Sequence, residues 1–211
     1  MGSVDNKKNS RTAPPEVRRK QLIDATITCV AKYGITGTTI SAVTKEAGLS
    51  LGLANFHFKS KDALLSETLI SLALEHRDLW MKASQKENLS SADKLRAIVD
   101  AQFHPRVCSR KKLAVWFAFF GEAAQRKSYR KSSSHIDIER QETSADLCSQ
   151  IIKDGGYTGV NAEDVSMSLE GLFDGLWLNI LMYPDKFNRE NANRQVLAYL
   201  KSVFPEHFAS A

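Results

Sequence analysis

The 211-residue sequence has few of the residues that build disulfide frameworks, metal sites or membrane spans. Its three cysteines (Cys29, Cys108 and Cys148) lie far apart, with no CxxC pair and no histidine at ligand spacing. Such a set argues against a disulfide scaffold or a zinc site and fits a reduced cytosolic protein. The longest strictly apolar run, residues 113–120, is too short to cross a bilayer, and the N-terminus lacks the apolar core of a signal peptide. We therefore expect a cytoplasmic protein with no metal and no membrane partner.

The sequence also lacks the local signatures of catalysis. It contains no nucleophile elbow, no phosphate-binding loop, no metal-ligand cluster and no pair of acids at useful spacing. We therefore predict that the protein is not an enzyme and uses no cofactor. An all-α enzyme and a pure assembly protein are the alternatives from other functional classes.

Strand patterns and internal repeats are absent as well, which predicts an all-α fold. Apolar residues recur at helical spacing, with Ser, Thr or Asn before the segments and Gly or Pro after them. Residues 1–15 are polar and basic, end in Pro-Pro and are predicted to form a disordered arm. The predicted helices cover residues 16–33, 38–47, 51–58, 60–85, 90–103, 111–124, 126–154, 161–180 and 188–204.

The excess of positive charge is confined to one end of the chain. Residues 1–62 hold ten Lys or Arg against five acids, whereas the remainder holds nineteen of each, so the first segment carries the whole formal charge of +5. A module that binds phosphates requires such a charge. The asymmetry alone fits an ordinary solvated basic tail equally well.

Residues 38–65 read as two short helices joined by a tight turn and followed by a third helix, which is the layout of a helix-turn-helix. Thr38 is predicted to cap the first helix, Gly48 to end it and Ser50 to cap the second. Ala54 and Phe58, four residues apart, are predicted to point inward. The remaining side chains of the second helix would then face a DNA major groove: Leu51, Gly52, Leu53, Asn55 and Phe56.

Three further features of the sequence bear on its charge and its core. Arg18, Arg19 and Lys20 fall in the first turn of a helix, where they oppose its dipole unless an anion such as DNA phosphate lies nearby; a flexible surface cluster is the other interpretation. His76 lies on an apolar stripe and is predicted to be a satisfied core histidine. Residues 113–120 are apolar on every side and predict a central buried helix.

The helix-turn-helix resembles that of the TetR family of bacterial repressors. The matching residues are Thr38-Thr39, Val43 to Ser50, Gly52, Asn55 to Phe58, Lys61 and Leu64-Leu65. Ala54 stands where the family usually has leucine, and Asn55 where it usually has tyrosine. Asparagine can pair with adenine through two hydrogen bonds, so this departure alters a predicted DNA contact.

Residues 95–103, 113–123 and 169–178 are similar to segments of the choline-responsive BetI branch of that family. The resemblance implies a DNA-binding domain (16–60) and a ligand-binding and dimerisation domain (61–211). It implies a homodimer formed through the long helices on either side of Gly155-Gly156, bound to a palindromic double-stranded operator and released by a small effector such as choline. The alternative within DNA binding is a regulator that senses a non-amine molecule or needs no ligand.

The resemblance also implies site residues. Thr39, His57 and Lys61 match positions that hold the DNA backbone, and their donor groups suit phosphate. The predicted DNA-binding set is Thr39, Ser50, Leu51, Gly52, Leu53, Asn55, Phe56, His57 and Lys61. For the effector, aromatic faces with one carboxylate suit a quaternary ammonium, although the same aromatics could simply fill a core. The predicted ligand-binding set is Phe103, Trp116, Phe120, Phe173, Asp174, Trp177 and Tyr183.

Overall fold

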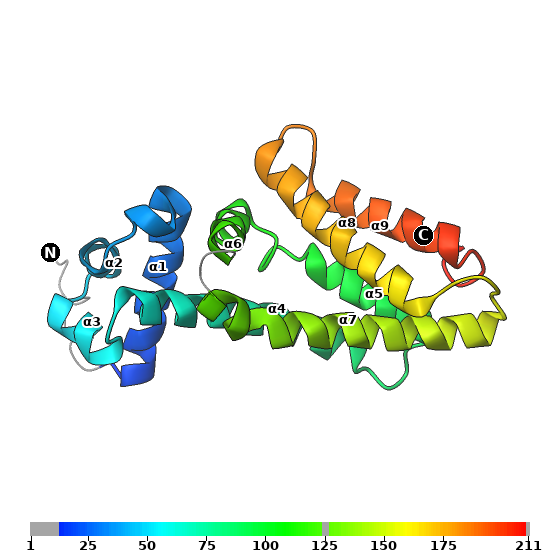
Figure 1. Cartoon of the computed structure of the whole chain (residues 1–211), viewed down its shortest axis with the longest axis horizontal. Coiled ribbons are helices and arrows are strands. Elements are labelled where there is room, and N and C mark those ends of the chain that lie inside the picture. The colour runs from blue at the N-terminus through cyan, green and yellow to red at the C-terminus, as the bar shows by residue number, and fades with distance from the viewer. Residues whose placement is uncertain (1–12, 124–126, 210–211) are drawn as a thin grey trace, which may run out of the picture. The chain divides into compact units, whose positions relative to one another are not determined.

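The computed structural model describes residues 13–123 and 127–209, and these ranges contain helices and no strand (Figure 1). The all-α prediction is therefore confirmed for the described chain. Of the predicted arm, residues 1–12 lie outside the described ranges, and Pro15 already belongs to the first helix. The helices are α1 (Pro15–Gly37), α2 (Ile40–Ala47), α3 (Leu51–His57), α4 (Lys61–Ser84), α5 (Ser91–Gln102), α6 (Arg110–Ala123), α7 (Lys127–Gly155), α8 (Ala162–Met182) and α9 (Arg189–Val203).

The described chain forms two compact units that divide between Thr68 and Leu69, within α4. The predicted domain boundary at residue 60 coincides with the start of that helix, where the Ser60 hydroxyl accepts a hydrogen bond from the Ala63 amide at 3.1 Å. In the described ranges no helix is both long and apolar enough to cross a membrane.

The first unit contains α1, α2, α3 and the beginning of α4. Gly34, at φ 69°, interrupts the helical geometry of α1 at the predicted end of the first helix, although a further turn continues to Gly37. The prediction that Thr38 caps α2 is wrong. Thr39 is the cap, with its hydroxyl accepting from the Ala42 amide at 3.1 Å, while the Thr38 hydroxyl donates to the Gly34 carbonyl at 2.7 Å.

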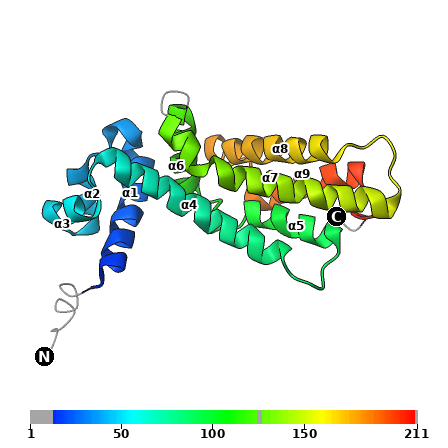
Figure 2. The same cartoon turned by 60° about the horizontal axis from the view of Figure 1, so that its bottom comes forward.

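The second unit is a bundle in which α7 packs against α5 and α8, and α9 packs against the same two helices (Figure 2). Three of these helices begin at the caps that the sequence predicts, since Ser90, Asn161 and Asn188 each accept a hydrogen bond from the amide three residues on. Their apolar faces form the core, in which Leu95, Ile98 and Val196 are fully buried.

Helix α6 is less buried than its sequence predicts. It packs against α7 and α8, and Leu113, Trp116 and Phe119 are buried, but Phe120 remains 42% exposed. The prediction of a helix buried on every side is therefore wrong. In the described part of the second unit, other helices cover only part of the α6 surface, and the side chain of Phe120 therefore stays partly accessible to solvent.

Candidate functional site

The turn of the helix-turn-helix is built by residues with specific backbone roles. Gly48 adopts φ 65°, a left-handed conformation that costs glycine little, and its amide contacts the carbonyls of Lys45 and Thr44. Ser50 then accepts a hydrogen bond from the Leu53 amide at 3.2 Å and starts α3. The cap and the turn therefore fix the direction in which α3 leaves α2.

Helix α3 presents one buried face and one exposed face. Ala54 is 1% and Phe58 is 3% exposed, as predicted, so the inward side is held in the core of the first unit. Phe56 is 78% and Leu51 is 52% exposed, which is unusual for large apolar side chains. Gly52 and Asn55 are also exposed, whereas Leu53 is half-buried.

The three residues predicted to hold the DNA backbone differ in accessibility. Thr39 is exposed, but its hydroxyl oxygen already caps α2. His57 is half-buried and its ring meets Phe56 edge-on, with 5.2 Å between centroids. Lys61 is half-buried and donates to the Thr36 carbonyl at 3.3 Å. All three lie in the first unit, within the helix-turn-helix or at the start of α4.

The basic cluster near the start of α1 has partners within the protein. Arg19 forms an ion pair with Glu67 at 2.7 Å, and its guanidinium lies 4.7 Å from the centroid of the Phe58 ring. Lys20 pairs with Asp24 at 2.7 Å, four residues along the same helix. Because α1 begins at Pro15, Arg19 and Lys20 lie just beyond its first turn, and each is paired with a carboxylate of the protein.

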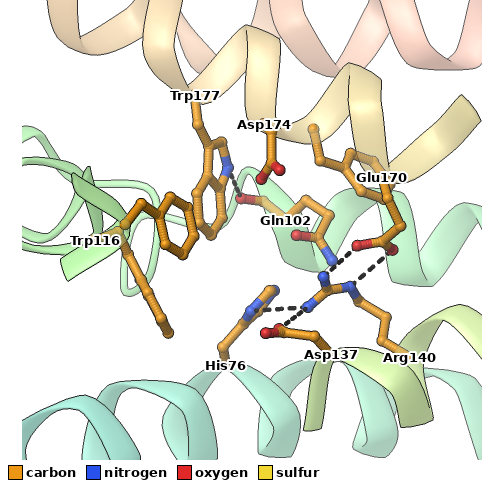
Figure 3. Close-up of a pocket in the computed structure, with 10 residues that line it drawn as sticks. His76, Gln102, Trp116, Asp137, Arg140, Glu170, Asp174 and Trp177 are labelled. Atoms are coloured by element: carbon orange, nitrogen blue, oxygen red, sulfur yellow. Dashed lines mark hydrogen bonds and ion pairs between the residues drawn. The ribbon is translucent and has the colours of Figure 1, made fainter. Parts of the chain in front are cut away.

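The second unit contains a cavity of about 210 Å³ that is partly open to solvent, since Phe120 and Asp174 of its wall are exposed (Figure 3). Its walls come from five helices, α4 to α8, and its residues span about a hundred positions of sequence. The lining residues are His76, Gln102, Trp116, Phe120, Asp137, Arg140, Glu170, Phe173, Asp174 and Trp177.

Part of the wall is aromatic. Trp116 lies between Phe120 and Trp177, with ring centroids 5.9 and 6.3 Å away, and the His76 ring is 5.6 Å from Trp177. The Trp177 indole N–H donates to the backbone carbonyl of Gln102 at 3.0 Å, which fixes the orientation of that ring. The rings are held at the separations typical of packed aromatic pairs.

Arg140 organises the polar part of the wall (Figure 3). Its Nε donates to Glu170 Oε1 at 3.0 Å, and its Nη2 makes a second, shorter bond to Glu170 Oε2. Its Nη1 lies 3.4 Å from Asp137 Oδ1 and 3.5 Å from His76 Nδ1. The paired geometry with Glu170 compensates for the burial of the guanidinium.

The surroundings shift several pKa values. Burial, followed by the charge of Arg140, lowers the pKa of His76 well below its ordinary value of 6.5. The Gln102 side chain opposes this shift as a nearby hydrogen-bond acceptor does, but it does not reach hydrogen-bonding geometry with Nε2, which has no partner. The imidazole is therefore neutral near pH 7. Burial raises the pKa of Asp137 and of Asp174. Asp174 is the more accessible of these two carboxylates and forms no ion pair in the described part of the chain.

The structure brings together five of the seven residues predicted for the ligand. Phe103 does not line the cavity, although its ring packs against that of Phe173, with 6.1 Å between centroids. Tyr183 follows the end of α8 and is 54% exposed. The sequence interpretation missed five lining residues: His76, Gln102, Asp137, Arg140 and Glu170. They lie on four different helices, so no local spacing could reveal that they meet.

No group of three potential ligands among the described residues could hold a metal ion. Two of the three cysteines are also unsuited to reactivity, because burial raises the pKa of Cys108 and of Cys148 to about 12.

Comparison with known proteins accounts for both parts of the chain. Residues 22–68 match the family model of the TetR family of bacterial regulatory proteins, and residues 91–205 match that of the BetI-type transcriptional repressor C-terminal domain. The HTH-type transcriptional regulator BetI of Paraburkholderia xenovorans (strain LB400) is 32% identical over 89% of this chain and 94% of its own length. This chain belongs to the TetR family. Within the family it is a BetI-type transcriptional repressor with a DNA-binding helix-turn-helix.

Solved structures of TetR-type regulators share the fold. A protein described as a transcriptional regulator from Pseudomonas aeruginosa PAO1 superimposes with a TM-score of 0.82 at 26% identity, covering 98% of this chain and 99% of that one. A regulator from Saccharomonospora viridis, solved in complex with choline, has a TM-score of 0.74 at 18% identity, covering 88% and 96% of the two chains. At that identity the second likeness shows the fold alone.

Proposed function

We propose that this repressor binds a palindromic operator as a homodimer and is released by a small organic cation, of which choline and related quaternary amines are the leading class. The observation that carries the proposal is the cavity of the second unit, which combines aromatic faces with acidic side chains inside a BetI-type domain. A quaternary ammonium cannot donate hydrogen bonds from its nitrogen but is attracted to aromatic faces.

The charge balance of the cavity favours a cation over an anion. Three carboxylates line it, against one guanidinium, and that guanidinium is engaged by two bonds to Glu170. Asp174 is left to face a ligand with its charge not matched by an ion pair. An anionic effector would have to displace Glu170 from Arg140, which would leave a buried charge unpaired.

The size of the cavity points in the same direction. Cavities for drug-sized ligands usually span about 300–1,000 Å³, whereas this one measures about 210 Å³. It suits a compact molecule, and choline is compact.

For DNA, we propose that α3 reads bases through the exposed side chains of Leu51, Asn55 and Phe56. Apolar groups can contact thymine methyls, and Asn55 supplies hydrogen bonds to an adenine edge. Thr39, His57 and Lys61 would contact phosphates, and Ser50 would orient the first turn. The positive charge of the first 62 residues supports this assignment.

For the dimer, we propose an interface built on α7 and α8. On α8, Met167 is 60%, Leu178 is 43% and Met182 is 59% exposed. They occur at helical spacing together with the exposed Gly171, so they form one apolar stripe along the helix. A symmetric partner would bury such a stripe, and two subunits would present two recognition helices to successive half-sites.

The test is calorimetric titration of the full-length protein with choline, betaine aldehyde and carnitine, paired with gel-shift measurement of operator release. Asp174→Asn should weaken choline binding about tenfold, because a carboxylate of the cavity wall beside the cation is lost. Asp78→Asn is the matched control, because Asp78 is an exposed carboxylate on α4, outside both the cavity wall and the helices proposed for the dimer interface. If operator binding proceeds normally and no amine produces heat, the protein senses another molecule or none.

A further inference from the structure

Three of the residues that line the cavity carry a buried N–H group without a hydrogen-bond partner. The nitrogen atoms are His76 Nε2, Gln102 Nε2 and Trp116 Nε1. Each residue is at most 3% exposed. Only two other buried side-chain atoms in the described chain lack a partner, Trp80 Nε1 and Ser144 Oγ, and neither belongs to a residue lining the cavity.

The contact with Arg140 determines which nitrogen of His76 carries the proton. A guanidinium has donors only, so at 3.5 Å from Arg140 Nη1 the Nδ1 atom of His76 acts as the acceptor. Because the buried ring is neutral near pH 7, its single proton then lies on Nε2. His76 therefore offers a donor, in a ring that α4 and the packed Trp177 hold in place.

Buried donors without a partner are costly. Because such a group loses its hydrogen bonds to water and gains none in return, proteins rarely concentrate several of them at one place. The aromatic faces and Asp174 would contact the cationic group of a ligand, but that group offers no acceptor for these three N–H groups. An oxygen atom of the ligand is the group that would satisfy them.

We propose that the effector carries, besides its cationic group, an acceptor oxygen that takes a hydrogen bond from His76 Nε2–H, and that His76 thereby distinguishes oxygen-bearing amines from plain tetraalkylammonium ions. The inference rests on the proposed function, because it takes the same cavity as the effector site. Gln102 and Trp116 carry the other two unpartnered donors of the cavity wall. The ligand class is a small cation with a hydroxyl, carbonyl or carboxylate oxygen.

The experiment compares choline with propyltrimethylammonium, in which a methyl group replaces the hydroxyl, by calorimetric titration of the full-length protein. We expect choline to bind about tenfold more tightly, the effect of one hydrogen bond to a donor that would otherwise stay unsatisfied. His76→Asn, whose side chain ends short of the Nε2 position, should remove this preference. His76→Gln places an amide N–H near that position and should retain part of it.

The outcomes separate the two proposals. If neither cation binds, the proposed function fails and this inference with it. If both bind equally well to the wild type, the effector site stands and the inference is overturned. The inference is also overturned if His76→Asn keeps the preference and Asp174→Asn removes it, because the hydroxyl would then be donating to a carboxylate.

A measurement on the unmodified protein guards against variants that fail to fold. In spectra of ¹⁵N-labelled imidazole groups, we expect the free protein to show His76 protonated on Nε2, and choline to shift that nitrogen. Propyltrimethylammonium should leave it in place. Equal shifts with both ligands, or a proton on Nδ1 in the free protein, would contradict the proposal.

Discussion

At the scale of single residues, His76 shows how a side chain can fit the apolar pattern of a core helix and still line a cavity. Its position on the apolar stripe of α4 correctly predicts burial, and it is 3% exposed. The prediction that the ring is fully satisfied is wrong, because Nε2 has no partner and the ring lines the cavity. Its neighbours Arg140 and Trp177 come from α7 and α8, which the sequence of α4 cannot indicate.

The buried, neutral His76 should make stability depend on pH. Its folded-state pKa lies below 6.5, so as the pH falls through 6.5 the unfolded chain binds a proton that the folded chain does not. The free energy of unfolding should therefore decrease below that pH, by at most about 1.4 kcal/mol per pH unit for one proton. Urea unfolding at a series of pH values should show a shallower decrease in His76→Gln than in the wild type. Parallel curves would contradict the expectation.

At the scale of elements, the helix-turn-helix depends on one glycine and tolerates change at another. Gly48 has φ 65° at the end of α2, and no atom lies within 4 Å of the point where a methyl group would stand, so backbone strain alone opposes substitution. Gly52 has ordinary helical geometry within α3 and equally open surroundings. The sequence correctly predicts the turn at Gly48, because glycine adopts the left-handed conformation at a helix end with little backbone strain.

Alanine at these two positions should act in opposite directions. Gly48→Ala should lower the free energy of unfolding by about 1–2 kcal/mol, the cost of a left-handed alanine. Gly52→Ala should raise it by up to about 1 kcal/mol, because alanine is the better helix former. Thermal unfolding of both variants by circular dichroism measures the difference. A stabilised Gly48→Ala would show that the turn adopts another conformation.

At the scale of the whole molecule, the features proposed for DNA binding and for ligand binding lie in different parts of the chain. The net positive charge lies in the first 62 residues, and the cavity lies in the second unit. The apolar stripe of α8 is among the exposed apolar surfaces of the second unit. The proposed binding of an operator by a symmetric pair of recognition helices would require a partner to cover this stripe.

The oligomeric state tests that requirement. Leu178→Glu should shift the protein from dimer to monomer in sedimentation and weaken operator binding in gel shifts, because a buried charge opposes association. Leu74→Glu is the matched control, since Leu74 is equally exposed at 43% but lies on α4. Dimers that persist in Leu178→Glu, or dissociate equally in both variants, would place the interface elsewhere.

The features that the sequence predicts correctly are local ones. Caps such as Ser50, Asn161 and Asn188 predict helix starts because a side-chain oxygen bonds an amide only three residues away. Apolar spacing predicts the inward side of α3, because residues four positions apart lie on the same face of a helix. The family motif of the helix-turn-helix is also contiguous, so the sequence alone identifies it.

Only the tertiary structure decided the composition of the cavity. Arg140 meets Glu170 and His76 across 30 and 64 positions of sequence, and a contact between helices depends on how whole bundles pack rather than on spacing. The same packing excludes Phe103 and Tyr183, which the aromatic pattern had included. The sequence thus predicted the kind of regulator, while the packing of five helices decided which side chains line the cavity proposed for its effector.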